Sequence, residues 1–135
     1  MRIELTGLDP RTHRFAIFRD DGSTESAVLE TRSFLVHDLT HYAVESVLKL
    51  DAGFYGLLAA GTKMAELNDR EKKWPEGTQI ARAESIVGPM QSHLTGKHFV
   101  MPDWPFIGEV EALYRKVWGQ WRGTKFGTPC VLQWG

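Results

Sequence analysis

Two histidines four residues apart, His37 and His41, have the spacing in this chain that points most directly to chemistry. On a helix, positions i and i+4 share one face about 6 Å apart, so both imidazoles can reach one metal ion at about 2.0 to 2.1 Å. Glu45 repeats the spacing and adds a carboxylate to the same face. We therefore predict a divalent metal site, with zinc as the ion, at His37 and His41.

The part that Glu45 plays stays open at this point. Eight residues of helix rise about 12 Å, which makes it hard for Glu45 to ligate an ion in company with His37. Glu45 can instead orient His41 from behind, or pair with Lys49 one turn further along. Ligand, orienting group and surface ion pair are therefore the three alternatives for this carboxylate.

A catalytic zinc site usually has three protein ligands and one position for water, so another residue must complete it. The downstream candidates are Glu84, His93, His98 and Asp103. We favour His93 or His98, because the segment 92–98 is polar and contains Gly96, which would let it fold back as a loop.

The stretch His37-Asp38-Leu39-Thr40-His41 resembles the zinc-binding H-E-x-x-H helix of the zincin metallopeptidases. That resemblance implies a zinc-dependent hydrolase in which Asp38 replaces the glutamate that acts as general base. Aspartate is one methylene shorter, so its carboxylate is withdrawn by about 1.5 Å, and a displacement of about 1 Å can cost on the order of 100-fold in rate. Asp38 is thus the candidate catalytic residue, and it can alternatively hold a histidine or ligate the ion.

A wider pattern, HDLTHYAVE at 37–45 followed by GFYGLLAAG at 53–61, resembles a group of small bacterial proteins. The resemblance implies a small stand-alone domain in a bacterial cytoplasm and implies no particular reaction.

A different interpretation of the same residues is structural. Asp38 is a good helix N-cap, and a helix that began there would leave His37 in a loop and remove the chelating geometry. Thr31 and Ser33 are competing caps that would keep His37 inside the helix. The alternative function is then a non-enzymatic binding or assembly domain whose histidine helix is a structural polar network.

Composition narrows the classes of partner. The chain has 135 residues, 42% of them hydrophobic, which predicts one domain over residues 1–135. Its formal net charge of -1 disfavours nucleic acid as a partner. Neither a signal peptide nor an apolar stretch long enough to cross a bilayer is expected, so we predict no membrane partner. The expected partner is a small molecule or peptide, with a homo-oligomer as a further possibility.

Other catalytic chemistry finds little support in the sequence. The single cysteine, Cys130, cannot form an intramolecular disulfide, which favours a reducing, cytoplasmic setting. Neither a G-x-S-x-G nucleophile motif nor a glycine-rich phosphate loop occurs. Four tryptophans in the last third are expected mainly to pack in the core, although they could line a pocket or a subunit interface; they are Trp104, Trp118, Trp121 and Trp134.

The elements that must position these residues follow from hydrophobic periodicity. Alternation predicts a strand over 2–6 and a hairpin of 13–19 with 25–30, joined by a turn at Asp20-Asp21-Gly22. A period near 3.6 predicts a helix from Phe34 to about Ala52-Gly53, with the histidines away from the centre of its apolar stripe.

Further along, segment 54–61 is expected to be buried and partly helical, and segment 63–74 to be solvated. A helix over 80–94 should kink or split at Gly88-Pro89, and Asp103 should cap a final helix that reaches Trp121. Residues 130–134 are expected to form a short last strand. Together these elements predict an α+β fold, in which a small, mostly antiparallel sheet packs with three to four helices.

Overall fold

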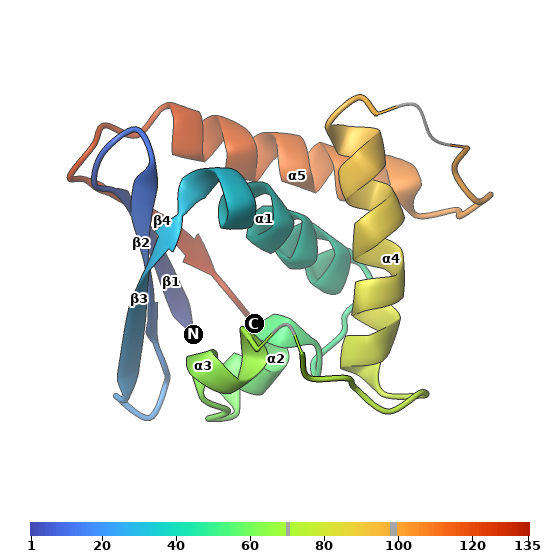
Figure 1. Cartoon of the computed structure of the whole chain (residues 1–135), viewed down its shortest axis with the longest axis horizontal. Helices are drawn as coiled ribbons and strands as arrows, with labels where there is room; N and C mark the ends of the chain where they lie inside the picture. Colours follow the sequence, from blue (N-terminus) through green and yellow to red (C-terminus); the bar gives the residue numbers. More distant parts are fainter. Residues whose placement is uncertain (70, 98–99) are drawn as a thin grey trace.

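In the part of the chain that the structure describes, four strands form one antiparallel sheet in the order β3-β2-β1-β4 (Figure 1). The computed structural model describes residues 1–69, 71–97 and 100–135. The strands are β1 (Arg2–Gly7), β2 (Thr12–Phe18), β3 (Thr24–Glu30) and β4 (Pro129–Gln133). The predicted hairpin is confirmed by the pairing of β2 with β3, and β4 adds to the other edge of β1. The predicted α+β class, with a mostly antiparallel sheet, is thereby confirmed.

One face of the sheet forms the base of the hydrophobic core. Side chains alternate along each strand, so every second residue of β1 and β2 points toward the helices. The inward residues are almost completely buried and include Ile3, Leu5, Phe15 and Ile17. Leu35, Leu39 and Ala43 of the first helix belong to the same buried cluster.

The described residues also form five helices: α1 (Thr31–Val47), α2 (Phe54–Ala59), α3 (Met64–Leu67), α4 (Gln79–Leu94) and α5 (Ile107–Arg122). Helix α1 is central, with the sheet at one end of the molecule and α4 at the other, and both α4 and α5 contact α1 (Figure 1). Across the described parts of the chain, no helix combines the length and the apolar character needed to cross a membrane.

Helix α1 begins earlier and ends earlier than its apolar stripe predicts. It starts at Thr31, which places His37 and His41 inside the helix and excludes Asp38 as its N-cap. It ends at Val47 because Lys49 adopts a left-handed backbone, with φ 54°. The Leu50 N–H then donates to the Glu45 carbonyl at 2.9 Å, the bond of a Schellman cap. A lysine occupies the position where glycine is usual, so the sequence carries no clear stop signal.

Two other boundaries also differ from the predictions. Helix α4 continues through Pro89 without splitting. The proline removes the bond to the Ser85 carbonyl, which lies on an exposed turn, while Val87 and Met90 stay buried on either side. Asp103 does not cap α5, whose N-cap is Phe106. The residue before a proline avoids helical backbone, so a helix containing Pro105 cannot begin as early as Trp104.

Candidate metal centre

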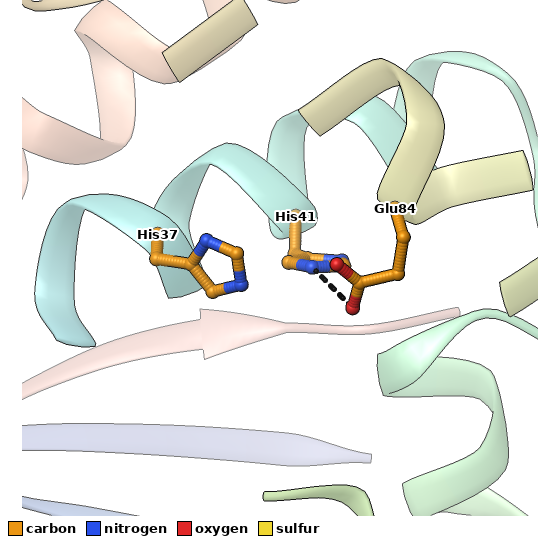
Figure 2. Close-up of side chains that lie close together, drawn as sticks. All are labelled: His37, His41 and Glu84. Atoms are coloured by element: carbon orange, nitrogen blue, oxygen red, sulfur yellow. Dashed lines mark ion pairs between the residues drawn. The ribbon is translucent and has the colours of Figure 1, made fainter. Parts of the chain in front are cut away.

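Two histidines of α1 and a glutamate of α4 form a cluster between the two helices (Figure 2). His41 lies where α1 is most buried, with 2% of its side chain exposed, whereas the Glu84 side chain is 45% exposed. His37 is intermediate. The cluster thus reaches from the protein interior to the solvent.

His41 is held on both sides by carboxylates. Its Nδ1 lies 2.7 Å from Glu45 Oε2, and its Nε2 lies 3.2 Å from Glu84 Oε1. Burial alone would lower the His41 pKa, but the hydrogen bonds to Glu45 and Glu84 outweigh it and raise the pKa to about 9. The same contact with His41 lowers the pKa of Glu84. Without an ion, a proton therefore occupies the Nε2 position between His41 and Glu84 at neutral pH.

His37 is oriented in a comparable way by an amide. Its Nδ1 lies 3.0 Å from the side-chain oxygen Oε1 of Gln91, on the next turns of α4 after Glu84. The two imidazoles are edge to face, with ring centroids 4.7 Å apart. In both rings, Nδ1 faces an oxygen acceptor, and that arrangement leaves Nε2 as the nitrogen with ligand geometry. Figure 2 shows a ring nitrogen of His37 on the side that faces His41 and Glu84.

The three side chains are close enough to share one ion. A ligand atom from each of His37, His41 and Glu84 lies within 4.8 Å of the other two. Ligand atoms around tetrahedral zinc, with bonds of about 2.0 to 2.1 Å, lie about 3.3 Å apart. Closure by about 1.5 Å, within reach of small side-chain rotations, would complete the site.

Glu45 does not belong to this ligand set. Its side chain is completely buried behind His41, and its two oxygens also accept the backbone N–H groups of Phe54 at 3.0 Å and Tyr55 at 2.9 Å. A Cβ added to Gly53 would lie 2.6 Å from the Glu45 carboxyl group, so this glycine makes room for it. Of the alternatives left by the sequence, the structure shows Glu45 orienting His41 rather than pairing with Lys49.

Asp38 lies beside the histidines on the same wall. It is 6% exposed, and its backbone carbonyl accepts the hydroxyl hydrogen of Tyr55 at 2.7 Å. Burial raises the pKa of its carboxyl group to about 7, although the nearby His41 opposes the rise. A carboxyl group with a pKa near neutrality can both accept and release a proton.

A cavity of about 490 Å³ opens in front of these groups. His37, Asp38, His41 and Glu84 form one wall. The other lining residues come from several elements and are Ser33, Phe34, Phe54, Leu67, Asn68, Asp69, Lys72, Trp74 and Gln91. The contributions of Gln91, Lys72 and Trp74 were not predicted, because no local motif connects these residues to a histidine pair about 30 to 50 positions earlier.

The remaining candidate ligands lie elsewhere or outside the described residues. The structure brings Glu84 to the histidine pair, whereas His93, which the sequence favoured, pairs through Nε2 with Glu111 at 3.2 Å. His98 falls on a residue that the structure does not describe, and Asp103 is exposed in the connection before α5.

The cysteine and the four tryptophans singled out from the sequence are buried or partly buried. Cys130 is buried in β4, and burial raises the pKa of its thiol, which keeps it protonated. The four tryptophans of the last third are partly buried and pack against the core, as expected. Trp134 stacks on Tyr55 with ring centroids 5.5 Å apart.

Comparison with known proteins adds no relative: no protein-family model, no curated protein and no solved structure matches the chain.

Proposed function

We propose that this protein binds a divalent metal ion at His37, His41 and Glu84 and uses it to hydrolyse a small molecule or peptide. One observation carries the proposal: two oriented imidazoles and a carboxylate from another helix converge on the wall of a cavity. Two imidazoles and one carboxylate form a ligand set typical of catalytic zinc, which makes zinc the proposed ion. The open cavity leaves room for water and substrate.

A zinc ion held by His37, His41 and Glu84 would supply Lewis acidity toward a carbonyl group and toward water. The chain's own residues would do the rest. Glu45 and Gln91 keep the two Nδ1 atoms engaged, so that each Nε2 faces the site. Asp38, which is buried beside the two histidines on the cavity lining, would accept a proton from water and pass it to the leaving group. The proposed likeness to the zincins is limited to the two histidines and the acidic residue between them on α1.

Zinc titration calorimetry on metal-free protein tests the binding step. We expect one equivalent to bind the wild type, and the double variant His37→Ala, His41→Ala to lose binding by at least about 100-fold. The matched control is His93→Ala, because His93 lies on α4 but pairs with Glu111 instead of joining the cluster. Equal zinc binding by the double variant would contradict the proposed ligands.

Substitution of the proposed base tests the hydrolytic step separately. Asp38→Asn should retain zinc and lose about 100-fold or more in turnover of any substrate found by screening, because the amide cannot accept the proton. An unchanged rate would remove Asp38 from the mechanism and leave the metal site intact.

A second candidate function is favoured by the completeness of the network around His41. A protonated imidazole that donates to both Glu45 and Glu84 is satisfied without an ion. In that case the protein is a binding or assembly domain, and failure of zinc to bind in the calorimetric experiment would select this function.

We also propose a cytoplasmic, bacterial setting. The cytoplasmic part is supported by the single cysteine, which is buried and has no disulfide partner in the sequence, and the bacterial part is carried over from the resemblance drawn in the sequence analysis. Fractionation of cells that express the tag-free protein, with a periplasmic marker as control, tests this location.

A further inference from the structure

Strand β3 is an edge strand of the described sheet, so one side of its backbone faces away from β2 (Figure 1). Its antiparallel ladder with β2 is unbroken along the whole strand. Just beyond one end of the ladder, the Arg19 N–H donates to the Ser23 carbonyl at 2.9 Å. Beyond the other end, the Thr31 N–H donates to the Arg11 carbonyl at 2.8 Å. Hydrogen-bonded pairs alternate along such a ladder, so the odd-numbered residues of β3 bond to β2. The even-numbered residues direct their backbone groups away from β2; they are Thr24, Ser26, Val28 and Glu30, and all four are exposed.

These outward backbone groups form an open row of donors and acceptors, which we call the β3 edge. The Glu30 carbonyl belongs to the start of α1, because Glu30 is the N-cap of that helix. The β3 edge then consists of the Glu30 N–H and of both backbone groups of the other three residues. No backbone hydrogen bond between described residues uses these groups. An exposed row of this kind is a template for pairing with another strand.

The opposite edge of the sheet, at β4, is better protected. The Trp134 N–H donates to the Met1 carbonyl at 2.9 Å, so the same alternation directs the odd-numbered residues of β4 outward. Two of these residues have lost part of their pairing capacity. Pro129 has no N–H, and the Gln133 carbonyl accepts the hydroxyl hydrogen of Tyr42 at 2.7 Å.

Strand β3 lacks such protection. Its sequence, TESAVLE, contains no proline, lysine or arginine, and its ladder has no bulge. A charge that points toward the core can also discourage pairing, but Glu25 is already paired with Arg19. The Glu25 carboxylate also accepts the Met64 N–H at 3.1 Å, on the face of the sheet that the helices cover. These contacts leave the β3 edge itself open.

We propose that two copies of this chain pair antiparallel through their β3 edges, so that their sheets join into one continuous sheet. A second copy presents the same alternation of N–H and C=O groups, which matches the edge donor for acceptor. A two-fold axis makes the contact isologous, so the dimer closes and does not extend into a fibre. The net charge of -1 per chain opposes this association little. The inference goes beyond the proposed function and needs no metal ion.

Two registers of the dimer leave the fewest edge groups without a partner. One opposes Ser26 to its own symmetry mate, and the other opposes Ala27 to its own symmetry mate. In these registers Glu25 faces an alanine or a leucine, and Glu30 faces a glycine or a threonine. No two carboxylates are therefore directly opposed, which would destabilise the pair.

Sedimentation velocity of metal-free protein in EDTA tests the dimer. We expect the dimer fraction of the wild type to rise between about 1 and 500 µM, because small interfaces are weak. Ser26→Pro removes an outward N–H that β2 does not use, so the monomer should stay folded by circular dichroism and dimerise at least about tenfold more weakly.

A second variant avoids any effect of proline on the strand. Val28→Lys places an ammonium group at the β3 edge and should also weaken the dimer by at least about tenfold. The matched control is Val131→Lys on β4, since Val28 is 59% exposed and Val131 is 47% exposed. This control should dimerise like the wild type.

Cysteine cross-linking tests the geometry of the contact. Directly opposed residues have Cα atoms about 4.5 to 5.5 Å apart, within the range that a disulfide spans. Under mild oxidation, Ser26→Cys or Ala27→Cys, whichever is opposed to its mate, should therefore form a covalent dimer. Val131→Cys should not, and neither should the wild type, whose Cys130 is buried.

A wild type that stays monomeric at all of these concentrations would overturn the inference. Loss of the dimer in Val131→Lys with its retention in both β3 variants would do the same, as would cross-linking at Val131 and at neither β3 position. Zinc binding is measured separately by calorimetry, so these failures are distinguishable from failure of the proposed function.

Discussion

At the scale of single residues, the proposed site depends on the Glu45 carboxylate, which contacts His41 Nδ1, as well as on the proposed ligands themselves. Glu45 receives three hydrogen bonds, one from His41 and two from the backbone of α2. A carboxylate can accept them all because it has two oxygens and no hydrogens of its own when ionised. This arrangement fixes the ring of His41 and ties it to α2.

The variant Glu45→Gln tests this function of the carboxylate. The amide NH₂ group would face a backbone N–H or the ring N–H, so at least one buried donor would lose its partner, and the free energy of unfolding should fall by about 1 to 3 kcal/mol. Zinc affinity should fall by about 10- to 100-fold, as is usual when a ligand loses its orienting partner. Glu76→Gln, at an exposed turn, is the control for urea denaturation and zinc titration. Wild-type zinc affinity in Glu45→Gln would contradict the orienting function.

The pKa of His41 leads to a pH prediction for the metal-free protein. The folded-state pKa of about 9 lies above the ordinary value of 6.5, because Glu45 and Glu84 favour the charged ring. The proton on His41 therefore stabilises the fold fully below pH 6.5, and this stabilisation is lost as the pH rises through about 9. The wild type should lose stability between pH 7 and pH 9.5 relative to His41→Gln in thermal denaturation. Parallel pH profiles for the two proteins would show that His41 is not protonated between the carboxylates.

At the scale of elements, the site depends on where α1 begins and on how α2 and α4 meet it. The histidine pair and its helix could be predicted from spacing alone, because both histidines and their helix lie within one short segment. Glu84 was one of four candidate ligands, and nothing in the sequence selected it, since its approach depends on the packing of α4 against α1. The end of α1 was also missed, because Lys49 adopts the left-handed conformation that usually marks a glycine.

Gly53, in the connection between α1 and α2, makes room for the Glu45 carboxyl group. Gly53→Ala should destabilise the protein by about 1 to 3 kcal/mol, because the new Cβ would lie 2.6 Å from the buried Glu45 carboxyl group. Gly119→Ala is a matched control: its Cβ would meet nothing within 4 Å beyond its chain neighbours on α5, and alanine should stabilise the helix by about 0.5 to 1 kcal/mol. Chemical denaturation measures both effects, and a neutral Gly53→Ala would contradict the close fit.

At the scale of the whole molecule, α1 is the shared support of the sheet, of α4 and of α5. The α+β class and the antiparallel sheet were predictable because alternating and helical periods occupy separate stretches of the chain. The cavity was not predictable, since its walls come from α1, α2, α3, α4 and the connection between α3 and α4, which meet only in the folded chain. An ion at His37, His41 and Glu84 would cross-link α1 to α4.

Zinc should therefore stabilise the fold as a whole. A ligand that binds only the folded state adds about 2.7 kcal/mol at 100 times its dissociation constant. Differential scanning calorimetry should show a higher Tm for the wild type with zinc. Glu84→Gln should show a much smaller increase, because it removes the link to α4 while its half-exposed side chain costs the fold little. An equal increase in Glu84→Gln would exclude Glu84 as a ligand.

The central claim is that one metal ion binds between His37, His41 and Glu84. The most direct measurement is a crystal structure of the zinc-loaded protein with diffraction data collected on both sides of the zinc absorption edge. The account predicts one strong anomalous peak about 2.0 to 2.1 Å from a nitrogen of each histidine and from a Glu84 oxygen. The absence of that peak, or its appearance only at His93 and Glu111, would contradict the account.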